Sequence, residues 1–113
     1  MTMQLGINFN EETPTARGIR QAVEHADQVT PGWSDQAYEF LLEFVDSFTG
    51  GFMAEDVRNE AESKRRVPAP PSARAWGAVI LRAAKSGVIR KVGYEKVKNQ
   101  RAHSTPAAVW RKN

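Results

Sequence analysis

The chain has 113 residues and contains no cysteine. Disulfide frameworks, zinc ribbons and thiol nucleophiles are therefore excluded, and a reducing compartment is the simplest expectation. Long apolar runs are missing as well, since no stretch approaches the roughly 18 apolar residues that a membrane span requires. The first residues also lack the basic and apolar pattern of a signal peptide. We expect a cytoplasmic protein without membrane association.

Residues of the kinds that carry catalysis are scarce. Of the two histidines, His25 has no Cys, Ser or second His at a ligand or catalytic spacing. No glycine-rich phosphate loop, metal-ligand pair or nucleophile motif is present. The sequence therefore predicts a protein that is not an enzyme, with no metal and no cofactor.

Negative charge is almost absent from the second half of the chain. Residues 63–113 hold thirteen Lys and Arg and a single acid, Glu95, a net charge of +12. Residues 1–62 hold three Arg and twelve Asp and Glu, a net charge of −9. A basic segment of this kind attracts a polyanion. The length fits one domain with an appended segment.

The first half of the chain predicts three helices. Thr13 caps the first helix, with Pro14 in its first turn, and the helix stops before Thr30. Its apolar stripe is Ala16, Ile19, Val23 and Ala26. Ser34 is expected to cap the second helix, with Trp33 as a hydrophobic staple. The apolar stripe of this helix is Tyr38, Leu41, Leu42, Val45 and Phe48. After a short extended stub, Phe52-Met53, the third helix is predicted over 54–62.

A proline-rich loop, residues 63–71, separates these helices from a fourth. Ser72 is expected to cap this helix, which is predicted over 73–85 and closed by Gly87. Its apolar back consists of Trp76, Val79, Ile80 and Ala83. Its front consists of Arg74, Ala78, Leu81 and Lys85, with Arg82 beside them. Gly77 in the middle of the helix indicates close approach of another element, either the third predicted helix or DNA.

The remaining residues predict a β-hairpin. A strand over 88–97, bulged at Gly93, is followed by a polar basic tip over 98–104. The second strand is predicted over 107–111, with Pro106 at its start. The expected fold class is α+β and mostly α. It is a winged helix with a three-helix core, a carboxy-terminal hairpin wing and an extra amino-terminal helix. We divide the chain into an arm and acidic amphipathic helix (1–30) and a winged-helix domain (31–113).

Four short motifs occur along the chain in this order: Ala75-Trp76-Gly77-Ala78, Gly87-Val88-Ile89, Gly93-Tyr94 and Val109-Trp110. In these motifs the sequence resembles small winged-helix proteins encoded by bacteriophages and prophages. The resemblance covers residues 48–111. It implies a DNA-binding protein of a bacterial or phage-infected cell, acting in transcriptional control or as a replication accessory.

Three basic segments define the predicted DNA-binding surface. Charged residues on one helix usually only solvate an exposed face, but a winged helix would bring the helix front, the loop after the third helix and the wing to one side. Ser72 and Arg74, at the start of the fourth helix, are the candidates for reading base edges. The predicted contacts are Lys64, Arg65, Arg66, Ser72, Arg74, Arg82, Lys85, Lys96, Lys98, Asn99, Arg101 and His103.

Several alternatives stay open at this stage. The basic face could instead dock an acidic protein, which would make the chain a winged-helix adaptor. RNA is not excluded, since phosphate-directed surfaces discriminate poorly. The acidic amino-terminal helix could form a homodimer or bind a protein partner. Trp76 and Trp110 are interpreted as packing anchors rather than stacking platforms.

Overall fold

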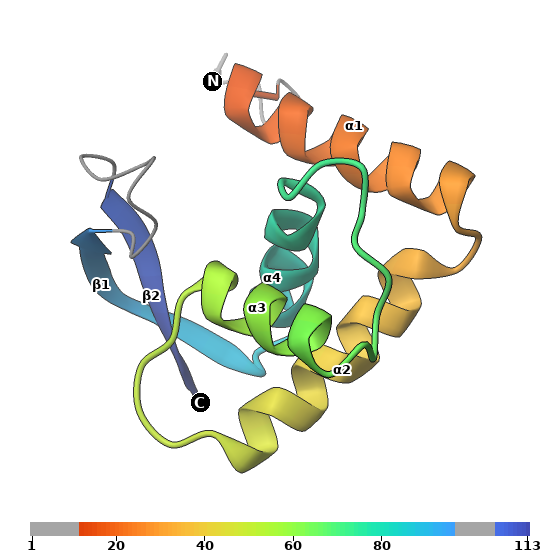
Figure 1. Cartoon of the computed structure of the whole chain (residues 1–113). Coiled ribbons are helices and arrows are strands. Elements are labelled where there is room, and N and C mark those ends of the chain that lie inside the picture. Colours follow the sequence, from red (N-terminus) through yellow and green to blue (C-terminus); the bar gives the residue numbers. More distant parts are fainter. Residues whose placement is uncertain (1–11, 97–105) are drawn as a thin grey trace, which may run out of the picture.

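The computed structural model describes residues 12–96 and 106–113, which form four helices and a two-stranded antiparallel hairpin. The helices are α1 (Pro14–Val29), α2 (Trp33–Ser47), α3 (Ala54–Ser63) and α4 (Ala75–Lys85). The strands are β1 (Ile89–Lys96) and β2 (Pro106–Lys112). Figure 1 shows the hairpin on one side of the helices and α1 lying across α4. The α+β, mostly helical class is thus confirmed.

Helix α1 begins as the sequence predicts and is followed by a tight turn. The Thr13 hydroxyl accepts a hydrogen bond from the backbone N–H of Ala16 at 3.0 Å. The turn ends at Gly32, whose φ of 81° is left-handed and suits glycine. Helix α2 therefore begins at Trp33, and the prediction that Ser34 caps it was wrong. The Ser34 side chain reaches back to α1 instead, because both its N–H and its hydroxyl donate to the Asp27 carboxylate at 2.8 Å.

The buried face of α2 differs in phase from the predicted stripe. Of the predicted residues, Leu41 and Val45 are buried, whereas Phe48 lies at the helix end and is 41% exposed. Phe40 and Phe44, which the predicted stripe left out, are buried. The complete buried set on this helix is Trp33, Ala37, Phe40, Leu41, Phe44 and Val45. The apolar surface of α2 is so wide that the helix could bury any of several neighbouring stripes. Contacts with α4 determine which stripe is buried.

The short segment before α3 joins the helices to the hairpin. Phe52 and Trp110 form an isolated antiparallel bridge, with N–H to O distances of 2.9 Å and 2.8 Å in the two directions. The Asp56 carboxylate then accepts from the backbone N–H of Met53 at 2.8 Å, which supports the first turn of α3. The predicted extended stub is confirmed, and it lies beside β2.

Helix α4 begins two residues later than predicted. Backbone N–H groups of residues 75, 76 and 77 bond to carbonyls three residues earlier, so a tighter turn leads into the helix. Ser72 does not cap α4. Its hydroxyl accepts only from the N–H of Arg74, at 3.3 Å, within that turn. The predicted apolar back is confirmed, since Trp76, Val79, Ile80 and Ala83 are all buried.

The hairpin strands pair with one irregularity, between Lys91 and Gly93. The predicted bulge is thus confirmed, with Val92 as the extra residue. The far end of the first predicted strand, Val97, lies outside the described residues.

Two tryptophans occupy the centre of the core. Trp33 and Trp76 are buried and meet edge to face, with ring centroids 5.3 Å apart and planes at 77°. Trp33 is thus a core residue, and its interpretation as a staple in front of the helix was wrong. Trp110 is buried as well, which confirms both predicted packing anchors. Ala26 of α1 belongs to the same core cluster. The division of the chain into a segment 1–30 and a domain 31–113 stays a prediction. Among the described helices none is long and apolar enough to cross a membrane.

Candidate nucleic-acid interface

The hairpin places two arginines directly opposite each other. Arg90 of β1 pairs in register with Arg111 of β2, so their side chains leave the same face of the hairpin. Both residues are exposed, and neither forms an ion pair within residues 12–96 and 106–113. Like charges at facing positions destabilise a strand pair. The hairpin thus holds a concentration of positive charge that its own described residues do not neutralise.

Lys91 is held beside two aromatic rings on the hairpin. Its ammonium group donates to the Tyr94 hydroxyl at 2.9 Å and lies 5.0 Å from the centre of that ring. It also lies 5.9 Å from the centre of the Trp110 ring. Tyr94 is 63% exposed. An exposed ring with a fixed cation beside it offers a polar ligand both a flat apolar surface and a positive charge.

Arg90, Lys91 and Arg111 were not among the predicted contacts. The prediction placed the basic wing at its tip, where Lys98, Asn99, Arg101 and His103 lie outside the described residues. Lys96 ends β1 opposite Pro106, and its side chain is likewise not described. Only the strand register reveals the facing arginines. That register depends on the one-residue bulge, so counting along the sequence could not find them.

Helix α1 lies beside the predicted front of α4, and the charged residues of that front remain exposed. A Cβ placed on Gly77 would lie 3.4 Å from Cδ1 of Ile19 in α1. The close approach that Gly77 indicated is therefore confirmed, but it comes from α1, not from the third predicted helix or DNA. Ala78 is half-buried in the same region, and hollows lined by α1 and α4 residues lie along the contact. The charged residues of the predicted front are thus exposed, whereas α1 packs beside its small residues, Gly77 and Ala78.

The charged residues at the edges of that front have different surroundings. Arg82 pairs with Asp35 of α2 at 2.9 Å and lies 4.0 Å above the ring of Tyr38. The Arg74 guanidinium lies over Gly18 of α1, since a Cβ placed there would be 3.0 Å from Nη1. Lys85 is exposed in the last turn. Within the described part of the chain, Arg74 and Lys85 have no ion pair.

Helix α1 is not itself acidic, contrary to the prediction. It contains two Arg, one Glu and one Asp, so its net charge is zero, and most of the acidic charge of residues 1–62 lies on α2 and α3. Arg20 donates to Glu12 at 2.7 Å and pairs with Glu24 at 3.2 Å. The hydrogen bond from Arg20 lowers the pKa of Glu12 and, with the bond to Glu24, raises the pKa of Arg20. Both partners of Arg20 lie in or directly before α1, so these pairs stabilise the helix itself and do not tie it to α4.

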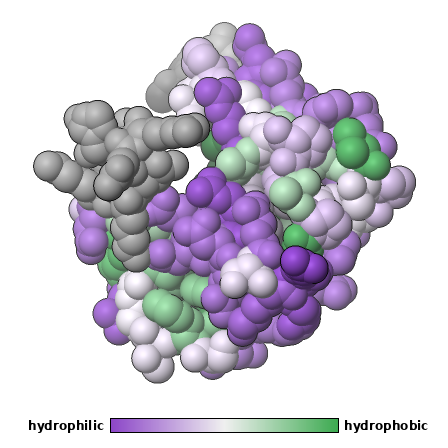
Figure 2. Space-filling model, viewed as in Figure 1, coloured by the Kyte–Doolittle hydropathy of each residue, from purple (hydrophilic) through white to green (hydrophobic). Residues whose placement is uncertain are grey.

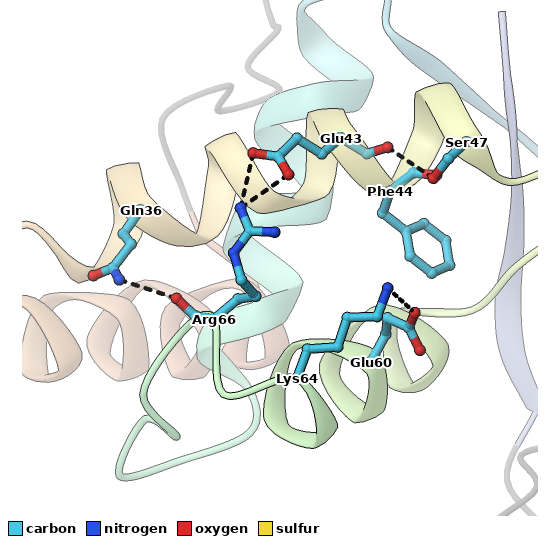
Figure 3. Close-up of polar contacts among 7 residues, drawn as sticks. All are labelled: Gln36, Glu43, Phe44, Ser47, Glu60, Lys64 and Arg66. Carbon is cyan, nitrogen blue, oxygen red and sulfur yellow. Dashed lines mark hydrogen bonds and ion pairs between the residues drawn. The ribbon is translucent and has the colours of Figure 1, made fainter.

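The predicted loop contacts lie apart from the hairpin. In Figure 3 Arg66 lies against α2, where its guanidinium donates to both oxygens of Glu43 at 2.9 Å and 3.0 Å. Its carbonyl accepts from the Gln36 side chain at 3.2 Å. Lys64 pairs with Glu60 at 2.9 Å. Figure 1 shows this loop on the side of α4 away from the hairpin. The loop after α3 therefore lies apart from the described part of the hairpin, and the predicted contacts at the wing tip lie outside the described residues.

The described surface is mainly polar. On the face shown in Figure 2, hydrophilic residues predominate and apolar residues form only small groups. Within residues 12–96 and 106–113, His, Asp and Glu do not gather into a group that could hold a metal ion.

Comparison with known proteins adds no relative. The chain matches no protein family, no curated protein and no solved structure.

Proposed function

We propose that the chain is a non-enzymatic winged-helix protein that binds double-stranded DNA through its basic hairpin. The facing pair Arg90 and Arg111 carries this proposal. Two like charges at facing positions repel each other and destabilise the hairpin. Phosphates bound beside them would relieve this repulsion, which favours binding. Residues 89–112 hold seven Lys and Arg against one Glu, so the wing is basic along its length. Releasing condensed counterions from DNA then drives association.

Several features support the winged-helix interpretation. The elements follow the order helix, extended stub, helix, helix and hairpin. The stub pairs with β2 through a single bridge at Phe52, at the edge of the two-stranded hairpin. In such a module α4 is the helix that enters the major groove. The resemblance to phage and prophage proteins adds a role in transcriptional control or as a replication accessory, in the cytoplasm of a bacterial or phage-infected cell.

A titration of duplex DNA at several salt concentrations tests this function. The variant Arg90→Gln plus Arg111→Gln removes two positive charges from the hairpin. The plot of log K against log salt has a negative slope, and each phosphate contact contributes roughly 0.9 to its magnitude. If each arginine neutralises one phosphate, the variant's slope is therefore less steep than that of wild type by about 1.8. The matched control, Lys64→Gln plus Arg65→Gln, removes the same charge from the loop after α3. We expect that control to keep the wild-type slope.

Two results would count against this function. The absence of binding to random duplex DNA even at low salt would refute it. An equal loss of slope in both variants would show that the net charge, rather than the hairpin, governs binding.

A second candidate function is a winged-helix adaptor whose basic hairpin docks an acidic protein. The position of α1 favours it, because α1 lies on the α4 face that DNA reading requires. If the chain is an adaptor, it shows no binding in the titration with duplex DNA. Its binding to the acidic partner is still lost in the Arg90→Gln plus Arg111→Gln variant.

A further inference from the structure

Helix α1 meets α4 at one specific point. The Ile19 side chain lies over Gly77, with Cδ1 at 3.4 Å and Cγ1 at 3.5 Å from the position that a Cβ on residue 77 would occupy. Glycine is unfavourable in a helix interior. Gly77 therefore destabilises α4, but its missing side chain leaves the space in which Ile19 of α1 packs.

Few side chains of α1 are buried around this point. Hollows of about 650, 520 and 190 Å³ lie along the seam between α1 and α4. Ala26, near the end of α1, is the one residue of this helix that is fully buried. Val23 is only partly buried and Ile19 is half-buried. Segments with few buried apolar contacts open at low free-energy cost. The amino-terminal half of α1 is thus weakly held.

The other end of α1 is anchored beside a turn. Asp27 accepts two hydrogen bonds from Ser34 at 2.8 Å, and Ala26 is in the core. Directly after them come Thr30, Pro31 and the left-handed Gly32. Motion is therefore easiest in residues 14–22, because the anchor keeps the last turn in place.

The α4 face beneath α1 has the shape and charge of a groove-binding surface. Small residues, Gly77 and Ala78, line its middle, and Arg74 and Lys85 lie at its two ends. The major groove is roughly 12 Å wide and a helix with its side chains measures about 10–12 Å across. One helix fits this groove and two packed helices do not. Helix α4 cannot enter a groove by this face while α1 lies on it.

We propose that α1 is a displaceable cover over the DNA-binding face of α4. Its amino-terminal half lifts from Gly77 when duplex DNA binds, and α4 then enters the major groove beside the basic hairpin. This inference rests on the proposed DNA-binding function. The affinity measured for the whole chain is then lower than that of the open state, by the fraction of molecules that are open.

A single engineered disulfide tests this cover in the full chain. The variant Ile19→Cys plus Gly77→Cys introduces the only two cysteines, since the chain has none. The Cβ on residue 77 would lie 3.5 Å from the Cγ1 position of residue 19, and a disulfide needs about 3.0 Å between these positions with normal bond geometry. Oxidation then locks α1 on α4, and reduction releases it.

Duplex DNA binding is measured for both redox forms, with the wild-type chain in the same buffers as the control. We expect the oxidised form to bind at least about tenfold more weakly than the reduced form. The separate variant Ile19→Ser, which weakens the contact without any cross-link, is expected to bind a few-fold more tightly than wild type. Circular dichroism of each variant checks that the helices are intact.

The possible failures are distinguishable. Equal binding by the oxidised and reduced forms would overturn the cover while leaving the hairpin as the DNA-binding site. A disulfide that does not form under oxidation would overturn it too, because α1 would not lie where the contact requires. If the wild-type chain itself binds no duplex DNA at low salt, the proposed function fails and the cover fails with it.

Discussion

The two central tryptophans make a matched test of the core. Both are buried and in contact, but their indole N–H groups differ. Nε1 of Trp33 donates to the carbonyl of Pro68 at 2.7 Å. Nε1 of Trp76 is buried without a hydrogen-bond partner in the described residues. Replacing each residue by Phe removes the same atoms, so the difference between the two variants isolates the N–H.

The expected difference follows from these contacts. Trp33→Phe loses a hydrogen bond worth about 0.5–1.5 kcal/mol, whereas Trp76→Phe removes an unsatisfied donor that costs about 1–3 kcal/mol. We therefore expect Trp33→Phe to lower the free energy of unfolding by about 1.5–4.5 kcal/mol more than Trp76→Phe does. Urea denaturation followed by far-ultraviolet circular dichroism measures both values, provided that the m-value is unchanged. Equal losses, or a larger loss for Trp76→Phe, would refute the reasoning.

Three further variants test other contacts. Asp27→Ala removes both acceptors of the Ser34 hydrogen bonds and is expected to cost about 1–2 kcal/mol in urea denaturation. Gly51→Ala would place a Cβ 2.8 Å from Cγ1 of Val109, and the overpacking should cost about 1–3 kcal/mol by the same measurement. The lowered pKa of Glu12 means that its ion pair stabilises α1 above the ordinary Glu pKa and is lost as pH falls through the lowered value. The protection factors for hydrogen exchange in the first turns of α1, which compare the measured rate with the intrinsic rate at each pH, should therefore fall at acidic pH in wild type. Glu12→Gln should abolish that fall.

Local patterns were sufficient for the elements and for part of their packing. The Thr13 cap of α1, the apolar back of α4 and the bulge in the hairpin were all predicted, and the structure confirms them. The start of α2 was misplaced because Ser34 is an adequate cap by residue type. Only the tertiary structure shows that the Ser34 hydroxyl donates to Asp27 of α1 instead of capping α2.

The candidate site was less predictable than the fold. A helical wheel separates the two faces of α4 but carries no information about which element covers each face. Ile19 and Gly77 are 58 positions apart in the sequence, so their contact depends on the path of the whole chain. The facing of Arg90 and Arg111 depends in the same way on strand register, which a single bulge shifts by one residue.

By itself, the sequence determined the α+β class, the order of the elements and the basic character of the second half. These properties arise from apolar periodicity, turn residues and residue charge, which act over a few neighbouring positions. Tertiary structure alone decided that α1 covers α4, that the loop after α3 pairs with α2, and that two arginines face each other on the hairpin. Such contacts join distant segments, and their geometry is fixed only when the common core around Trp33 and Trp76 has formed.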